Sequence, residues 1–122
     1  MHLMSFPLRI AAVCLLGAAL LPAQPAGPYD TKADAHKDLA AAQQRAAKSK
    51  KYVMVIFGAN WCKDCVVLHQ LLDAPGNKEY VDAHFEIVGV DLGRFDKHLD
   101  IAKALKVDLD KGIPAAAFLA PD

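Results

Sequence analysis

The chain has 122 residues, 54% of them hydrophobic, and its 14 basic and 14 acidic residues give a formal net charge of zero at pH 7. This length and composition predict one small globular domain. The two signs of charge are interspersed along the sequence, so nucleic acids and other polyanions are not expected partners.

The first 23 residues have the layout of a secretory signal peptide. Arg9 supplies a weak positive charge, Ile10–Leu21 is an apolar stretch, and small residues follow up to Ala23. A membrane-spanning helix needs about 20 apolar residues, so this stretch is short for a span. We expect cleavage after Ala23 and a periplasmic or secreted mature protein without a stable membrane span. An uncleaved anchor is the alternative.

After the signal, residues 24–33 are expected to form a linker and residues 34–122 the folded domain. Asp30 or Thr31 is placed to cap a helix that runs to about Lys50 through an alanine-rich segment of high helix propensity. The run Tyr52–Phe57 is apolar, does not alternate, and is rich in β-branched residues, so it predicts a strand covered on both faces.

The remaining elements alternate between helix and strand. The pattern predicts a helix over Cys62–Asp73, a short helical piece from Asn77, a strand over Phe85–Asp91, a helix over Asp96–Leu105 and a last strand over Ala115–Ala120. This order predicts an α/β fold with helices on both faces of a sheet. Four phenylalanines are expected in its core, namely Phe57, Phe85, Phe95 and Phe118.

The sequence Trp61-Cys62-Lys63-Asp64-Cys65 follows the first apolar strand after a short Gly-Ala-Asn turn. Cys62 is therefore expected at a helix N-terminus, where free backbone N–H groups and the helix dipole favour a thiolate. Cys65 follows three positions later, so both sulfurs share one helix face at about the separation that a disulfide needs. Such a pair is suited to thiol–disulfide exchange.

A strand, a WCxxC motif and a helix, followed later by Ile113-Pro114 before another strand, resemble the thioredoxin superfamily. The motif is similar to that of exported bacterial thioredoxin-like proteins and of the soluble thioredoxin-like domain of DsbD-type reductant conduits. The resemblance implies a thioredoxin-like fold, with a mixed sheet flanked by helices.

The resemblance also implies a role for each motif residue. Cys62 attacks a partner disulfide and Cys65 resolves the mixed disulfide, while Trp61 flanks the site. Pro114 follows a cis peptide bond and faces the two sulfurs, and the Ile113 backbone pairs with the substrate chain. No organic cofactor and no metal are expected.

The chain departs from the family pattern in several places. Ile56 and Ile87 stand where the family commonly carries a buried acid and a lysine, so Cys65 needs water or another group for its deprotonation. Between the cysteines, Lys63 favours the Cys62 thiolate and Asp64 opposes it, which leaves the net effect open. The family's final strand and helix are missing after residue 120, so we expect a C-terminally truncated domain.

The predicted function is a thiol–disulfide oxidoreductase of the cell envelope that reduces partner disulfides. Its expected partners are protein dithiols and disulfides and a redox donor protein, and we expect a monomer. The alternative is a non-enzymatic binding module, or a domain that holds copper or zinc through Cys62, Cys65 and His69. His69 is expected to be a surface residue of its helix.

Overall fold

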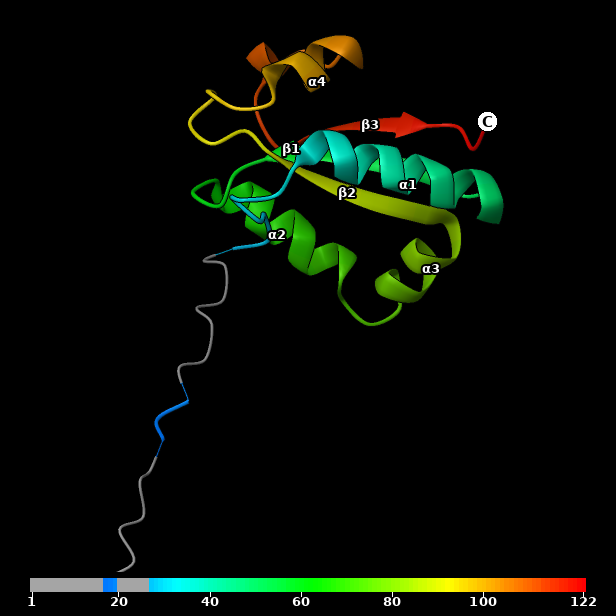
Figure 1. Ribbon diagram of the computed structural model, residues 1–122, viewed down its shortest axis with the longest axis horizontal. Helices are drawn as coiled ribbons and strands as arrows, with labels where there is room; N and C mark the ends of the chain where they lie inside the picture. The colour runs from blue at the N-terminus through cyan, green and yellow to red at the C-terminus, as the bar shows by residue number, and fades with distance from the viewer. Residues whose placement is uncertain (1–16, 20–26) are drawn as a thin grey trace, which may run out of the picture.

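The computed structural model describes residues 17–19 and 27–122, so most of the predicted signal peptide, with its cleavage site, lies outside the described residues. Helices separate the strands along the chain (Figure 1). The elements are α1 (Ala35–Ser49), β1 (Tyr52–Gly58), α2 (Lys63–Leu72), α3 (Asn77–His84), β2 (Phe85–Asp91), α4 (Leu99–Ala104), the 3-10 helix η1 (Leu109–Lys111) and β3 (Ala115–Leu119).

The three strands of the described residues form one mixed sheet with β1 in the centre. β2 runs parallel to β1, with Tyr52 opposite Phe85 and Gly58 opposite Asp91. β3 runs antiparallel on the other side of β1, with Phe57 opposite Ala115. The mixed sheet that the resemblance implied is therefore confirmed, and β1 delivers the chain to the cysteine motif from the middle of the sheet.

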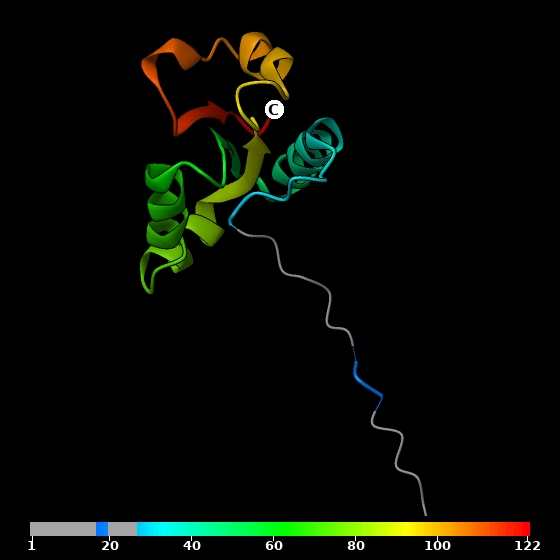
Figure 2. The same cartoon turned by 90° about the vertical axis from the view of Figure 1, so that its left-hand side faces the viewer.

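Helices cover both faces of this sheet, as the sequence predicted. In Figure 2, α1 lies on one side of the strands, and α2 with α3 lies on the other. Val53, Val55 and Phe57 of β1 face α1 and share a core with its alanines and with Ile101 of α4. Because side chains alternate along a strand, Ile56 and Gly58 face α2. Coverage of both faces explains why the β1 sequence is apolar without alternation.

The start of α1 differs from the prediction. Asp34 is its N-cap, and its side chain accepts a hydrogen bond from the Lys37 backbone N–H at 3.2 Å. The Asp30 carboxylate instead accepts from the Lys32 N–H at 2.9 Å and closes a local turn. Asp30 and Thr31 were therefore wrong as caps, because an aspartate fits a local turn as well as a helix start.

Two further expectations were wrong. α4 begins at Leu99 rather than at Asp96, since Phe95 and His98 have positive φ angles of 61° and 55° that a helix does not allow. Phe95 and Phe118 do not lie in the core, because 42% and 59% of their surfaces are exposed. Phe57 is fully buried, as predicted.

No helix within residues 17–19 and 27–122 is long and apolar enough to cross a membrane.

Candidate active site

Cys62 lies at the N-cap position of α2, as the sequence predicted. Its backbone N–H donates to the Ala59 carbonyl at 3.1 Å, which closes the turn after β1. Its Sγ accepts a hydrogen bond from the Cys65 backbone N–H at 3.3 Å. An N-cap normally uses an oxygen for this purpose. Here the helix directs a backbone donor at a sulfur instead.

Cys65 is fully buried behind Cys62, one turn into α2. Burial raises the pKa of the Cys65 thiol to about 11, assisted by its hydrogen bond with Cys62 and by the Asp64 charge, while a hydrogen bond with the Ala59 backbone acts in the opposite direction. Both cysteines are free thiols. The pair therefore consists of an outer sulfur at the helix start and an inner sulfur that keeps its proton near neutral pH.

Ile113 reaches the cysteines from the segment before β3, and Pro114 follows it. The Ile113–Pro114 peptide bond is cis, as the resemblance implied. Ile113 packs against the buried cluster of Tyr29, Cys62 and Cys65, and its carbonyl oxygen lies 3.8 Å from Cys62 Sγ, within hydrogen-bonding range of the thiol. This segment thus borders the outer sulfur directly.

Trp61 is exposed beside Cys62, with 47% of its surface accessible. Its indole N–H donates to the Gly93 carbonyl at 2.6 Å. The Phe95 ring lies 6.0 Å from the Trp61 ring, and the Arg94 guanidinium lies 5.3 Å from it in a cation–π contact. The loop after β2 therefore fixes the orientation of Trp61 and adds a second exposed aromatic ring, Phe95, next to the site.

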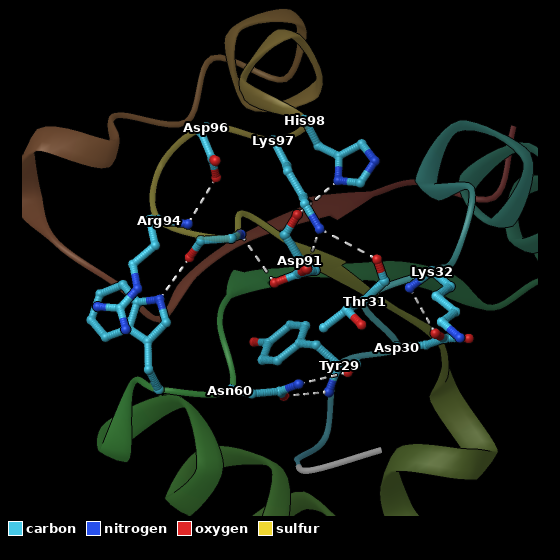
Figure 3. A network of polar contacts seen from close by, with 12 residues as sticks. Tyr29, Asp30, Thr31, Lys32, Asn60, Asp91, Arg94, Asp96, Lys97 and His98 are labelled. Atoms are coloured by element: carbon cyan, nitrogen blue, oxygen red, sulfur yellow. Dashed lines mark hydrogen bonds and ion pairs between the residues drawn. The ribbon is translucent and has the colours of Figure 1, made fainter. Parts of the chain in front are cut away.

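Asp91 organises that loop from the end of β2. Its carboxylate is buried, accepts a hydrogen bond from the Gly93 N–H at 3.0 Å, and lies 3.6 Å from the Lys97 ammonium. His98 Nδ1 lies 2.7 Å from the Asp91 carbonyl oxygen (Figure 3). Asp91 is thus a structural residue of the loop that carries Trp61.

Lys63 and Asp64 are exposed in the first turn of α2. Asp64 acts on the inner sulfur, since its negative charge contributes to the raised pKa of Cys65. Their influence on Cys62 stays a prediction.

Sequence reasoning missed Tyr29, which came within the expected linker 24–33. Its side chain is 99% buried and packs with Cys62 and Cys65 in one cluster. Asn60 clamps the Tyr29 backbone from both sides, accepting from its N–H at 2.9 Å and donating to its carbonyl at 2.8 Å (Figure 3). The segment before α1 therefore completes the site from behind.

Two glycines make room for the Tyr29 ring on the α2 face of the sheet. A Cβ atom added at Gly58 would collide with the Tyr29 hydroxyl, and would lie 2.7 Å from Cys65 Sγ. A Cβ atom added at Gly89 would lie 3.4 Å from the Tyr29 ring, in ordinary contact. Two glycines in adjacent strands, on what becomes the same face of the sheet, are the sequence signal that could have revealed a bulky group at this place.

His69 is half-buried rather than a surface residue, so the expectation for it was wrong. Its ring packs edge-on against Tyr29, with ring centroids 4.8 Å apart, and its Nε2 is buried without a hydrogen-bond partner among the described residues. Burial lowers the pKa of His69, although the charge of Asp73 opposes this. No three His, Cys, Asp or Glu side chains within the described part of the chain come together as metal ligands.

Comparisons with known proteins agree with this geometry. A family model described as thioredoxin-like matches residues 34–121. The fold is also similar to the crystal structure of a disulphide isomerase from Xylella fastidiosa Temecula1, with 35% sequence identity and a TM-score of 0.77 over 79% of this chain and 73% of that one. No curated protein matches the chain. The family model covers the strand, the cysteine motif and the cis-proline segment, and the chain therefore belongs to the thioredoxin-like family.

Proposed function

We propose that this protein is a thiol–disulfide oxidoreductase of the cell envelope that reduces disulfides of partner proteins through Cys62 and Cys65. One observation carries the proposal. Cys62 Sγ, at the N-cap of α2, accepts the Cys65 N–H at 3.3 Å, while the second sulfur is buried one turn behind it. An outer cysteine that keeps 8% of its surface exposed and a fully buried inner thiol divide the work of attack and resolution.

The reaction consists of two exchanges. The Cys62 thiolate attacks one sulfur of the client disulfide, a bond forms between Cys62 and that sulfur, and the other client sulfur leaves as a thiolate. Cys65 then attacks Cys62 Sγ, which forms the Cys62–Cys65 disulfide and releases the second client thiol. The client gains two electrons and the cysteine pair loses two, so a dithiol donor protein must reduce the pair for the next cycle.

The surface around Cys62 suits an extended client chain. We assign client contact to Trp61, which presents an exposed ring, to Ile113, whose carbonyl borders the outer sulfur, and to Pro114, which follows it. The Ile113 backbone would pair with the client as an added strand. Lys63 and Asp64, both exposed next to the sulfurs, tune the charge at the point of attack.

The cellular setting is proposed from the N-terminal sequence. The signal layout of residues 1–23 supports export to the periplasm or beyond, with no stable membrane span after cleavage. We propose that the exported protein is a monomer. The direction of electron flow is tested by the redox potential of the Cys62–Cys65 couple. A value near about −270 mV, as in thioredoxin, supports reduction, and one near about −120 mV would make the protein an oxidant.

Insulin reduction with dithiothreitol as donor tests the activity. The wild-type protein should accelerate insulin precipitation, and both Cys62→Ser and Cys65→Ser should abolish the acceleration. Ser49→Ala, at an exposed residue of α1 away from the motif, is the control, and it should retain the full rate. Equal rates for wild type and Cys62→Ser would overturn the proposal.

A further inference from the structure

The Tyr29 hydroxyl is a buried polar group without a hydrogen-bond partner among the described residues. A buried hydroxyl in this state is uncommon, because leaving it unpaired costs about as much free energy as a lost hydrogen bond. Its backbone is fixed by Asn60 and its ring is held between the sheet and His69, so the hydroxyl has a defined direction. It ends at the inner sulfur of the site.

We propose that Tyr29 is a positioning residue for resolution, and that its hydroxyl donates a hydrogen bond to Cys65 when that sulfur is a thiolate. The inference rests on the proposed function, because Cys65 needs to ionise only if it resolves a mixed disulfide. In the dithiol form the sulfur is a weak acceptor, and the hydroxyl stays unpaired. In the thiolate form the sulfur becomes a strong acceptor, and the bond forms.

The geometry places the donor and the acceptor together. Tyr29 and Cys65 belong to the same buried cluster, and both line the space above Gly58, where one added methyl group would collide with the hydroxyl and lie 2.7 Å from Cys65 Sγ. Ile56, which stands where the family commonly carries a buried acid, is fully buried and offers no proton-binding group. Tyr29 thus supplies a polar contact from a different element, the segment before α1.

The charges around the pair keep Tyr29 a donor. Burial raises the pKa of Tyr29 well above its usual range, and negative charge on Cys65, Cys62 and Asp91 raises it further. The other ionisable groups that face the pair are Asp64 in the first turn of α2 and the half-buried His69 ring. A tyrosine that holds its proton cannot be the base. It lowers the free energy of the Cys65 thiolate and leaves the proton to another acceptor.

The proton balance of the step follows from this. The Cys65 thiol loses its proton and attacks Cys62 Sγ, and the bond between Cys62 and the client breaks. The client thiolate leaves with the electron pair and takes up one proton, so the step releases no net proton. Tyr29 keeps its O–H bond throughout and contributes a hydrogen bond that strengthens as charge develops on Cys65.

Stopped-flow reaction of the reduced Cys14→Ser protein with the aromatic disulfide DTNB separates the two steps. The first release of coloured thiolate reports attack by Cys62, and the second reports attack by Cys65 on the mixed disulfide. Tyr29→Phe should slow the second release about tenfold between pH 6 and 9 and leave the first unchanged. The control Tyr80→Phe, at a tyrosine with 61% of its surface exposed, should alter neither release.

Replacing Tyr29 with 3,5-difluorotyrosine distinguishes hydrogen bonding from packing. The fluorinated ring is a stronger hydrogen-bond donor, so the second release should become faster, whereas a disturbance of packing would slow it. An unchanged second release in both Tyr29 variants would overturn the inference while the first release, and with it the proposed function, still stands.

The inference can also be tested if the first release is absent and the proposed function fails. In the Cys14→Ser/Cys62→Ser protein, the ¹³Cβ chemical shift of Cys65 reports its ionisation without any reagent. Tyr29→Phe should move the titration midpoint upward by about one pH unit. An unmoved midpoint would contradict the hydrogen bond.

Discussion

Gly58→Ala tests the close packing behind the cysteine pair. The new methyl group would lie 2.7 Å from Cys65 Sγ and 2.8 Å from Tyr29 Cζ, and still closer to the Tyr29 hydroxyl. Ordinary non-bonded carbon contacts lie at about 3.5–4.0 Å, so the methyl group is roughly 1 Å too close to two side chains at once. Neither neighbouring side chain can move away easily, because Cys65 is held in α2 and the Tyr29 backbone is hydrogen-bonded to Asn60.

Overpacking of this kind destabilises a core by about 1–3 kcal/mol. For a domain of this size, each kcal/mol lowers Tm by roughly 4–8 °C, so Tm should fall by about 5–20 °C. Differential scanning calorimetry of the reduced protein measures the change. Because the methyl group displaces Cys65, insulin reduction should fall as well.

Gly89→Ala is the matched control. It adds the same methyl group on the same face of the neighbouring strand, but its nearest neighbour is the Tyr29 ring at 3.4 Å. The change in stability should stay within about 0.5 kcal/mol. In the double variant Tyr29→Phe/Gly58→Ala the closest contact is removed, so part of the lost stability should return. Equal melting temperatures for Gly58→Ala and Gly89→Ala would refute the packing described for the site.

Three further predictions concern pH, client binding and the loop after β2. Burial raises the pKa of Cys65 from 9.0 to about 11, so between these values the folded protein keeps a proton that the unfolded chain loses. The stability of the reduced protein should therefore be highest below pH 9 and fall as the pH rises towards 11. Urea unfolding at pH 8 and 10 measures this fall, which should be smaller in Cys65→Ala. Trp61→Ala should lower kcat/KM for insulin several-fold without changing the urea midpoint, since the Trp61 ring is exposed. An equal loss of rate with the small disulfide DTNB would assign Trp61 to the chemical step rather than to client binding. Asp91→Ala should destabilise the fold by about 1–3 kcal/mol, because it leaves the Gly93 N–H unpaired. Asp96→Ala, at an exposed residue that accepts the Arg94 N–H, should cost less stability. Equal unfolding midpoints for the two variants would contradict the role of Asp91.

The front of the site could be predicted because local signals determine it. An apolar run gives β1, a cysteine follows the turn after it, and the spacing of three places the second cysteine on the same face of α2. These features depend on residues within one or two turns of each other. The segment around Ile113 and Pro114 came from the family pattern, and the structure places it against the sulfurs.

The back of the site could not be predicted because contacts between distant residues determine it. Tyr29 is held by Asn60, 31 residues further along the chain, and by the space that Gly58 and Gly89 leave. Its neighbours in sequence, Gly27, Pro28 and Asp30, have the composition of a linker. His69 follows Cys65 by four residues, which fixes its helix face but does not show that Tyr29 covers its ring.

The exposed aromatic residues were mispredicted for a similar reason. Phe95 is apolar, but it lies in the loop after β2 with a positive φ and packs beside Trp61. Phe118 lies on an exposed position of β3 and contacts Phe85 across the sheet. Hydrophobicity predicts burial only when the tertiary structure supplies a layer that covers the side chain.

The most direct measurement of the account is the capture of an insulin chain by variants in the Cys14→Ser background that keep only one cysteine of the motif. With Cys65→Ser, the mixed disulfide cannot be resolved, so mass spectrometry of the trapped species should find insulin linked to Cys62. With Cys62→Ser, the remaining Cys65 is buried and protonated, and no adduct should form at pH 7. Adducts of equal yield from both variants, or none from Cys65→Ser, would contradict the assignment of Cys62 as the attacking sulfur.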